Sequence, residues 1–379
     1  MKTLFLLTVS LLGLSVSASA QAVVVCSRPL PTANLNNTAG ANRSNVSWSF
    51  GNDWQTGDDC TIGVTGETWV VTKLTGWTTS GAPGTSRIGD RFASVNLYLG
   101  TPTVPLALMS AGNITANDNT NSNPSIVHTA VRYADNTDYQ VPSNAYIQLW
   151  QTDFANLAYV VSGGQKLRFS ADGTLVTGVP YYWFNHASNS AKSGVAQQDA
   201  DGKILAWAKN DFINLVPYEF DSSIDGWDKS SDLNVVIYAE QLGEGMATGG
   251  GWFVPEPDKM KNLTLDGSKA TFGFIARNKK SVTSGNLEFH YNANGINLSS
   301  TGYDSAMIGT SQAMFTGTGT INGAGAFKFS VRAVDGDKLS AGAPDRFEIR
   351  IWANDGTFED PLYRAEGNLG GGQVVVNKK

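Results

Sequence analysis

The stretch FTGTGTINGAGAFKFSVRAVDG, Phe315–Gly336, followed by DRFEIRIW, Asp345–Trp352, decides the fold of this chain. Apolar residues take every second position from Phe327 to Ala333 and again from Phe347 to Ile351. Successive side chains of a strand point to opposite faces, so each run offers one apolar and one polar face. The glycines from Gly317 to Gly325 predict a bend before the first run. We therefore predict two neighbouring strands of an antiparallel sheet.

The rest of the chain has the same character. It contains 41 glycines and 16% charged residues, and it lacks the repeating Glu, Lys and Leu pattern of helices. Short β-branched and aromatic runs recur between turn residues, for example at Thr68–Trp77 and Asn234–Glu240. Asp201-Gly202 predicts a tight turn between strands at Gly194–Gln198 and Lys203–Ala208. These patterns predict an all-β protein of the β-sandwich, jelly-roll-like type.

The length predicts two domains behind a leader. Removing the first 20 of 379 residues leaves about 360, more than one core usually holds. The glycine-rich run GEGMATGGG at Gly243–Gly251 is typical of a hinge. We therefore predict a signal peptide at residues 1–20, an N-terminal β-sandwich at 21–242 and a second β-sandwich at 249–379.

The N-terminus predicts export. Lys2 precedes the apolar segment Leu4–Leu14, and Ala18-Ser19-Ala20 has the small-residue pattern of a cleavage site. A buried N-terminal strand is the alternative. No later segment has the length and apolarity of a membrane span. The formal charge of −6 argues against nucleic acid or an anionic membrane as a partner. We expect a secreted, extracellular protein.

Cys26 and Cys60 are the two cysteines, 34 residues apart. After export they would enter an oxidising compartment, where a disulfide is favoured. A metal site is the alternative reading, but neither cysteine belongs to a C-x-x-C pair and no histidine stands beside them. The sequence predicts a structural disulfide that ties the N-terminal arm to the first sheet.

Six segments carry a family resemblance in the C-terminal third: GGGW, FGFIARNKK, SGNLEFHYN, GTGTING, DRFEIRIW and GGGQVVV. In this order, over residues 249–378, they resemble the small β-domain that follows choice-of-anchor modules in secreted bacterial and archaeal proteins. Residues 58–100 resemble sandwich segments of similar exported proteins. The resemblance implies export and a β fold. It implies no catalytic residues.

Aromatic residues of the N-terminal part are candidates for carbohydrate binding. A sugar can lie on an aromatic face while nearby polar groups bond its hydroxyls, and such mixed linings are typical of ligand sites. The candidates are Trp183, Tyr182, Trp150 and Trp207. The alternative for each is a place in the core, where large rings are common.

Asp335, Asp337 and Asp345 bracket the loop between the two opening strands. Clustered carboxylates suit calcium, which takes six to eight oxygen ligands, so Ca²⁺ is the one candidate cofactor. The alternative is a solvated loop in which the aspartates stabilise turns.

No motif for a nucleophile or a metalloprotease occurs, although His186 stands among polar residues and could act as a base. The first hypothesis is therefore a non-catalytic surface or extracellular-matrix component. The second is a carbohydrate-binding protein, and the third is a secreted hydrolase or lyase whose site assembles from distant strands. Expected partners are polysaccharides or neighbouring surface proteins, and exposed edge strands in both domains could support self-association.

Overall fold

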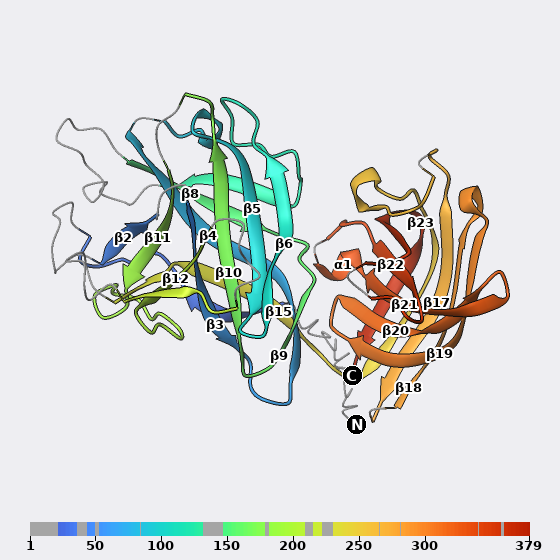
Figure 1. Ribbon diagram of the computed structural model, residues 1–379. Helices are drawn as coiled ribbons and strands as arrows, with labels where there is room; N and C mark the ends of the chain where they lie inside the picture. The colour runs from blue at the N-terminus through green and yellow to red at the C-terminus, as the bar shows by residue number, and fades with distance from the viewer. Residues whose placement is uncertain are drawn as a thin grey trace, which may run out of the picture.

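The computed structural model describes residues 22–35, 44–49, 53–83, 85–131, 147–178, 182–208, 215–221, 230–264, 266–280, 282–339, 341–357 and 360–379. Strands dominate this part of the chain, which confirms the all-β class (Figure 1). The helical segments described are η1 (Ile88–Asp90), η2 (Pro257–Lys259), η3 (Asn292–Asn294) and α1 (Gly336–Leu339). Across these ranges none is long and apolar enough to span a membrane. The predicted signal peptide lies outside the described residues.

The N-terminal part contains two antiparallel sheets. Within the described residues the larger sheet has nine strands: β1 (Val23–Arg28), β2 (Asn45–Trp48), β4 (Thr68–Pro83), β7 (Ile126–Val131), β8 (Ile147–Phe154), β9 (Tyr159–Ser162), β11 (Trp183–Asn189), β14 (Ser231–Leu233) and β15 (Val235–Leu242). The smaller sheet, in spatial order, has six: β13 (Tyr218–Asp221), β12 (Lys203–Ala208), β3 (Trp54–Ile62), β10 (Gln165–Leu175), β5 (Phe92–Thr101) and β6 (Val104–Asn113).

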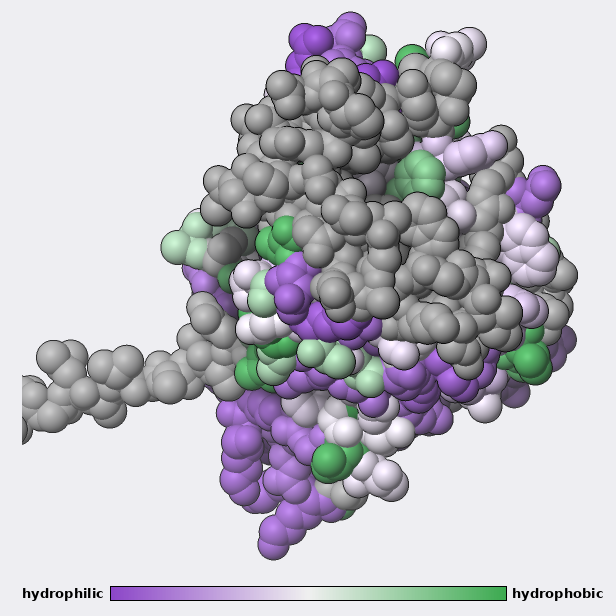
Figure 2. Space-filling model, turned by 90° about the vertical axis from the view of Figure 1, so that its left-hand side faces the viewer, coloured by the Kyte–Doolittle hydropathy of each residue, from purple (hydrophilic) through white to green (hydrophobic). Residues whose placement is uncertain are grey.

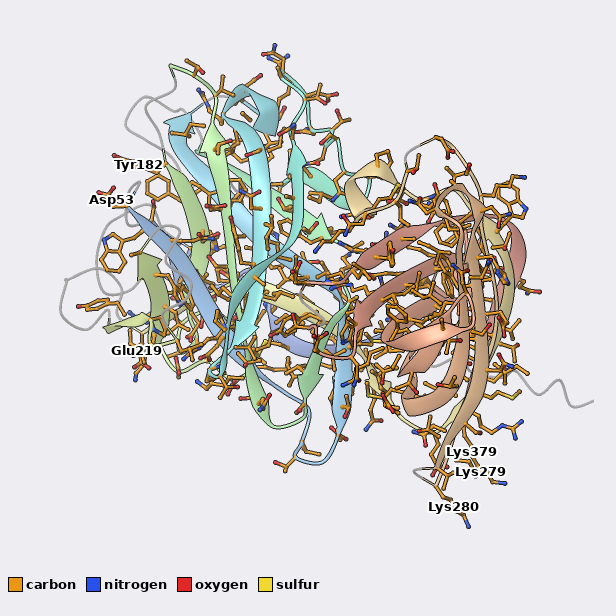
Figure 3. All side chains as sticks on the ribbon, turned by 45° about the vertical axis from the view of Figure 1, so that its right-hand side comes forward. Asp53, Tyr182, Glu219, Lys279, Lys280 and Lys379 are labelled. Atoms are coloured by element: carbon orange, nitrogen blue, oxygen red, sulfur yellow. A yellow bond between two sulfur atoms is a disulfide. The ribbon has the colours of Figure 1, made fainter. Side chains whose placement is uncertain are left out.

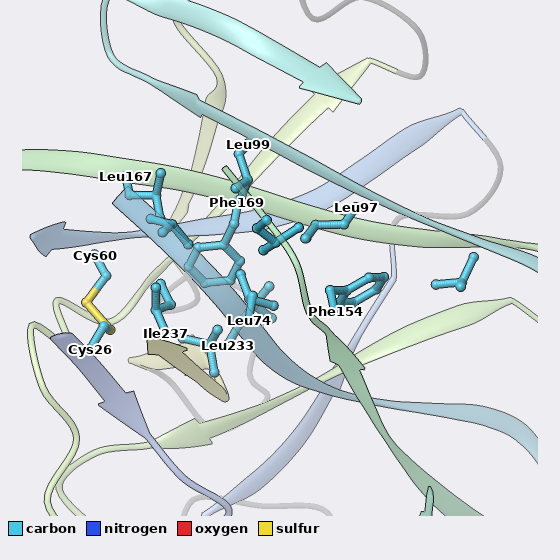
Figure 4. Packing of buried hydrophobic residues seen from close by; sticks show 14 of the residues in the cluster. Cys26, Cys60, Leu74, Leu97, Leu99, Phe154, Leu167, Phe169, Leu233 and Ile237 are labelled. Carbon is cyan, nitrogen blue, oxygen red and sulfur yellow. A yellow bond between two sulfur atoms is a disulfide. The ribbon is translucent and has the colours of Figure 1, made fainter. Parts of the chain in front are cut away.

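These two sheets pack face to face as the predicted sandwich. Leu74 and Ile237 of the nine-stranded sheet share one buried cluster with Leu167 and Phe169 of the six-stranded sheet (Figure 4). The alternation of apolar and polar residues along each strand places these groups between the sheets. Apolar burial between the layers is the main favourable contribution to the stability of such a fold.

The predicted disulfide forms. Cys26 on β1 and Cys60 on β3 are bonded, with their Cα atoms 6.4 Å apart. Because β1 belongs to the nine-stranded sheet and β3 to the six-stranded one, the bond joins the two layers at the buried edge of the core (Figure 4). The N-terminal strand is thereby held covalently to the sandwich.

The C-terminal part is a closed barrel, so the prediction of a second sandwich was wrong. Each strand pairs with the next, and the last pairs with the first. The strands are β16 (Gly245–Phe253), β17 (Ala270–Lys279), β18 (Val282–Tyr291), β19 (Ile296–Ile308), β20 (Gln312–Ile321), β21 (Ala324–Val334), β22 (Arg346–Ala353) and β23 (Tyr363–Lys378).

The interior of the barrel is filled by side chains. An eight-stranded barrel is just wide enough for this. Phe272 and Phe347 stack with their ring centroids 3.9 Å apart, and Phe274 and Phe315 approach to 5.0 Å. The alternation seen in the opening stretch therefore serves one central core rather than the space between two sheets.

The two opening strands are β21 and β22, and they pair antiparallel as predicted. The predicted bend is displaced: Gly317 and Gly319 lie inside β20, and the turn is made by Asn322-Gly323. Both turn residues have positive φ, 53° and 74°, as a two-residue hairpin turn of type I′ requires. A Cβ on Gly317 would lie 2.7 Å from Cζ of Phe329, so this glycine makes room for a core ring.

The glycine run predicted as a hinge is strand β16. A Cβ on Gly249 would lie 2.5 Å from Cε1 of Phe274, and one on Gly251 would collide with the carbonyl oxygen of Gly371. Glycine in a strand often marks such a close approach. The run therefore allows tight closure of the barrel rather than flexibility.

Of the two strands predicted on either side of the Asp201-Gly202 turn, only the second one forms. Gly194–Gln198 is not a strand, whereas Lys203–Ala208 is β12 and pairs with β3 and β13. The amides of Asp201 and Gly202 donate to Oδ1 of Asp232 at 3.0 and 3.1 Å. The turn residues thus attach a loop to β14 instead of linking two strands.

The sandwich and the barrel lie side by side (Figure 1), and buried polar contacts join them. The carboxylate of Glu240 on β15 accepts hydrogen bonds from the amides of Thr310 and Ser311, each at 3.1 Å, and from the Ser311 hydroxyl. Arg332 on β21 donates from Nη2 to the carbonyl oxygen of Leu157 at 3.1 Å. Glu240 and Arg332 are both buried, so this join excludes water.

Candidate functional site

The candidate site is a split in the six-stranded sheet. Strands β3 and β10 pair from Ile62↔Gln165 to Gly57↔Ser170 and then separate. Beyond that point β3 continues beside β12 as far as Trp54, while β10 continues beside β5. A cavity of about 260 Å³ lies between the separated ends, lined by Trp54–Thr56 on one side and Ala171–Leu175 on the other.

Strand β11 of the opposite sheet forms the floor. Nε1 of Trp183 donates to Oδ1 of Asn185 at 3.0 Å, and Nδ2 of Asn185 donates to the carbonyl oxygen of Ala171 at 3.2 Å. The Trp183 ring packs against Phe92 with centroids 4.7 Å apart. It also lies over Gly173, where a Cβ would come within 2.6 Å of Cζ3. The floor is therefore fixed by both packing and hydrogen bonds.

Two aromatic rings at the rim are open to solvent. Trp54 is 43% exposed and Tyr182 is 42% exposed, and both line the cavity. Figure 3 shows Tyr182, Asp53 and Glu219 at the same end of the sandwich. Figure 2 views the molecule from this end. Hydrophobic and hydrophilic residues are mixed over the described surface and do not form one apolar patch.

A buried amide beside the cavity lacks a partner. Gln55 is 3% exposed, and among the described residues its Nε2 has no hydrogen-bond acceptor. Gln55 is one of the lining residues, next to Thr56, which is also buried. Buried amides are almost always paired, so an unpaired one calls for a physical reason. An oxygen atom of a bound ligand would supply the missing acceptor.

The structure brings together two of the four predicted aromatic residues. Tyr182 and Trp183 line the cavity, but Trp150 is fully buried and donates from Nε1 to the carbonyl oxygen of Ser86 at 3.1 Å. Trp207 is buried on the outer face of the six-stranded sheet, where it packs against Leu106 and Leu205. Neither ring offers a face to a ligand.

Sequence reasoning missed Trp54. It is the first residue of β3 and follows directly on the polar Asp53. A tryptophan at the start of a strand, next to a polar segment, was a usable signal, because strand ends are more exposed than strand centres. Its neighbour in space, however, could not be found this way, since Tyr182 belongs to a distant segment.

The three aspartates predicted for calcium act on the backbone instead. Asp345 accepts from the amides of Gly336 at 2.8 Å and Val374 at 2.6 Å, and Asp335 accepts from the amide of Val376 at 3.1 Å. The carboxylate of Asp337 accepts from the amide of Gly342 at 3.3 Å. In the described ranges no group of three or more His, Cys, Asp or Glu side chains could hold a metal ion. Calcium binding at these aspartates stays a prediction.

The histidines do not line the cavity. His186 is fully buried, with Nδ1 2.7 Å from Oδ1 of Asn234. His290 places Nδ1 2.7 Å from Oδ1 of Asn297. His128 is buried, and burial lowers its pKa to about 4. The hypothesis of a hydrolase with His186 as its base therefore has no support from the position of that ring.

A buried ionic cluster stands near the disulfide, and its residues are not among those that line the cavity. Nη1 of Arg28 lies 2.7 Å from Oδ2 of Asp58 and 3.7 Å from Oδ1 of Asp232. Burial raises the pKa of Asp58 to about 8 and that of Asp232 to about 6, against the opposing effect of Arg28. The cluster connects β1, β3 and β14, which belong to both sheets. Its role is to join the layers.

No protein-family model, curated protein or solved structure matches this chain. Similarity therefore assigns no function. The resemblance to the β-domain that follows choice-of-anchor modules remains a prediction.

Proposed function

We propose that the protein is an exported, non-catalytic protein that binds carbohydrate in the split of the six-stranded sheet. The observation that supports this is that one cavity combines two solvent-exposed rings, Trp54 and Tyr182, with a hydrogen-bonded floor formed by Trp183 and Asn185. A sugar ring presents an apolar C–H face, which packs on an aromatic ring, and hydroxyl groups, which bond to amides.

The size of the cavity supports a small ligand unit. Its volume of about 260 Å³ lies just below the range of roughly 300–1,000 Å³ typical of pockets for drug-sized molecules. One sugar ring suits this space, while further rings of a polysaccharide would lie outside it against Trp54 and Tyr182. The fixed positions of Trp183 and Asn185 reduce the ordering cost of binding.

Export is part of the proposal. The leader pattern at residues 1–20 supports it, and so does the Cys26–Cys60 disulfide, because such bonds persist mainly in oxidising compartments. Polysaccharides of cell walls and matrices are found in those same compartments.

Two variants test the proposal. Calorimetric titration of the purified mature protein with a panel of soluble polysaccharides should reveal binding. The Trp54→Ala and Tyr182→Ala variants should each weaken it about tenfold or more, since each removes an exposed aromatic contact. Trp252→Ala is the control, because this half-buried tryptophan lies on the barrel beneath Lys269. Absence of binding to every polysaccharide would contradict the proposal.

A structural role at the cell surface is the second candidate function. The buried join at Glu240 and Arg332 favours it, because a two-part molecule with a dry, hydrogen-bonded connection can hold its ends at a constant distance. Sedimentation of the pure protein over a wide concentration range tests this role. Reversible growth beyond the monomer would support it, and a constant monomer mass would count against it.

A further inference from the structure

The cavity has the form of a wedge between two strands that diverge. One wall is Trp54–Thr56 of β3, and the other is Ala171–Leu175 of β10. The walls come together where Gly57 pairs with Ser170. Strand β11 closes the cavity from the side of the opposite sheet, where Trp183 lies across it. The wedge therefore narrows toward the middle of the six-stranded sheet and widens toward the end of the sandwich.

The narrow end of the wedge is closed by contacts between its two walls. Oγ of Ser170 donates to the carbonyl oxygen of Thr56 at 2.6 Å, and both residues are buried. A Cβ on Gly57 would lie 2.3 Å from the carbonyl oxygen of Phe169, so the two backbones are already in close contact. A polymer that enters at the wide end cannot continue between the walls past this point.

The wide end of the wedge carries exposed aromatic rings. Trp54 is the first residue of β3, and Tyr182 directly precedes β11. A third ring, Tyr218 on β13, is 60% exposed, and its centroid lies 6.4 Å from that of Trp54. Such rings offer apolar faces to sugar units outside the cavity. The aromatic contacts thus continue outward from the wide end.

We propose that the cavity binds the terminal sugar unit of a glycan chain, while the next units lie against the aromatic rings at the wide end. This inference rests on the proposed carbohydrate-binding function. An internal unit is linked on both sides and needs two exits, but the floor and the closed narrow end block a straight path through the cavity. A terminal unit needs a single exit, and about 260 Å³ suits one ring.

The buried amide at the cavity favours a terminal unit as well. Gln55 is 3% exposed, it lines the cavity next to Thr56, and its Nε2 has no acceptor among the described residues. A terminal ring keeps a hydroxyl group that an internal ring loses to its second glycosidic bond, and a hydroxyl oxygen can accept from an amide. Binding of a chain end would therefore supply a partner for a buried donor.

Chain length provides the first test. Linear glucans, galactans, mannans and xylans, each at two lengths that differ about tenfold, are titrated by calorimetry with the full mature chain. A linear chain has the same ends at either length, so we expect one bound protein per chain at both lengths. The Kd per mole of chain should agree within about twofold. Binding to internal units would instead raise the number of bound proteins with chain length.

Blocking each end provides the second test. Reduction of the reducing-end unit to an open-chain alcohol removes the ring at one end, and methylation of the free linkage hydroxyl blocks the other end. One of these two changes should weaken binding of the short chains about tenfold or more, because a buried polar group then lacks its partner. A protein that binds internal units would respond to neither change.

A variant at the buried amide separates binding from folding. Gln55→Leu should weaken binding severalfold and leave the denaturant midpoint unchanged or raised, because it removes a buried donor that has no partner among the described residues. A purely structural role for Gln55 would lower the midpoint and leave the affinity unchanged. Gln373→Leu on β23 is the matched control at an exposed position of the barrel, and it should leave the affinity unchanged.

The possible outcomes are distinct. If the number of bound proteins grows with chain length, or if neither blocked end weakens binding, the inference is wrong while carbohydrate binding itself stands. Full affinity in Gln55→Leu contradicts the part assigned to the amide. If no glycan of either length binds, the proposed function is wrong and the inference is wrong with it.

Discussion

His128 shows at the scale of one residue how the fold sets a protonation state. The side-chain oxygen of Asn121 accepts from the amide of Asn123 at 2.9 Å, which turns Nδ2 of Asn121 toward the histidine. That Nδ2 donates to Nε2 of His128 at 3.1 Å, while Nδ1 of His128 lies 3.0 Å from the Thr152 hydroxyl. A proton on Nε2 would place two donors against each other. The neutral ring is therefore the folded form, in line with its lowered pKa.

This arrangement predicts sensitivity to acid. The pKa of His128 is about 4 in the folded protein and 6.5 ordinarily, so the unfolded chain binds the proton more strongly. The stability that the neutral ring confers is complete above pH 6.5 and is lost as the pH falls towards 4. At most about 3 kcal/mol is involved. His128→Gln should flatten the dependence of the denaturant midpoint on pH between 7 and 4. Parallel curves for the variant and wild type would contradict this account.

At the scale of elements, the split exists because β3 and β10 each change partner. Both strands pair with each other up to Gly57↔Ser170, and Oγ of Ser170 donates to the carbonyl oxygen of Thr56 at 2.6 Å just before they part. Beyond this point β3 pairs with β12 and β10 stays paired with β5, so neither strand loses its place in the sheet. A ligand site is thus built from continuous strands, which hold side chains more rigidly than loops do.

The turn at Asn322-Gly323 yields a second prediction. Gly323 has φ of 74° and nothing within 4 Å of a Cβ position, so Gly323→Ala would introduce backbone strain without a clash. We expect a loss of about 1 kcal/mol in the free energy of unfolding. Gly273→Ala is the matched control, since Gly273 also has open space but lies in β17 with ordinary φ. Its stability should stay within about 0.5 kcal/mol of wild type. Equal effects in the two variants, measured by chemical denaturation, would rule out the conformational cause.

Sequence patterns predicted which face of a strand is buried better than they predicted which strands pair with each other. The alternation around Phe329 and Phe347 gave the correct buried face and the correct pairing, because these strands are close in the chain. It did not reveal that β16 pairs with β23, since closure of the barrel depends on contacts between its two ends. The glycines of β16 were ambiguous for the same reason: their meaning depends on Phe274 and Gly371. Tyr182 and Trp183 were found by composition, but the split that gives them a cavity was not.

At the scale of the whole molecule, Glu240 couples the two parts. Its carboxylate accepts three hydrogen bonds from Thr310 and Ser311, and β15, which carries it, leads directly into β16. An isolated bridge between Gly243 and Ile308 lies beside it. The connection between sandwich and barrel is therefore fixed by several hydrogen bonds in addition to the chain itself.

Removing this carboxylate should loosen the join. Glu240→Ala leaves the buried amide of Ser311 and the half-buried amide of Thr310 without this acceptor, and the buried one alone costs about 1–3 kcal/mol. Hydrogen exchange of the peptide that contains them should accelerate at least tenfold. Glu244→Ala is the control: this more exposed carboxylate accepts from the amide of Lys280 at 2.8 Å and lies outside the join. Unchanged exchange in Glu240→Ala would show that the join is held by other contacts.

Closure of the barrel has a consequence for any polymer this protein forms. Each of its eight strands has a paired neighbour on either side in the ring, so the barrel has no edge strand to which another copy could add along its full length. The sandwich, by contrast, ends in β1 at one margin and in β6 and β13 at others. If copies associate through these edge strands, the sandwiches would form the continuous array. The barrels would project from that array at regular intervals.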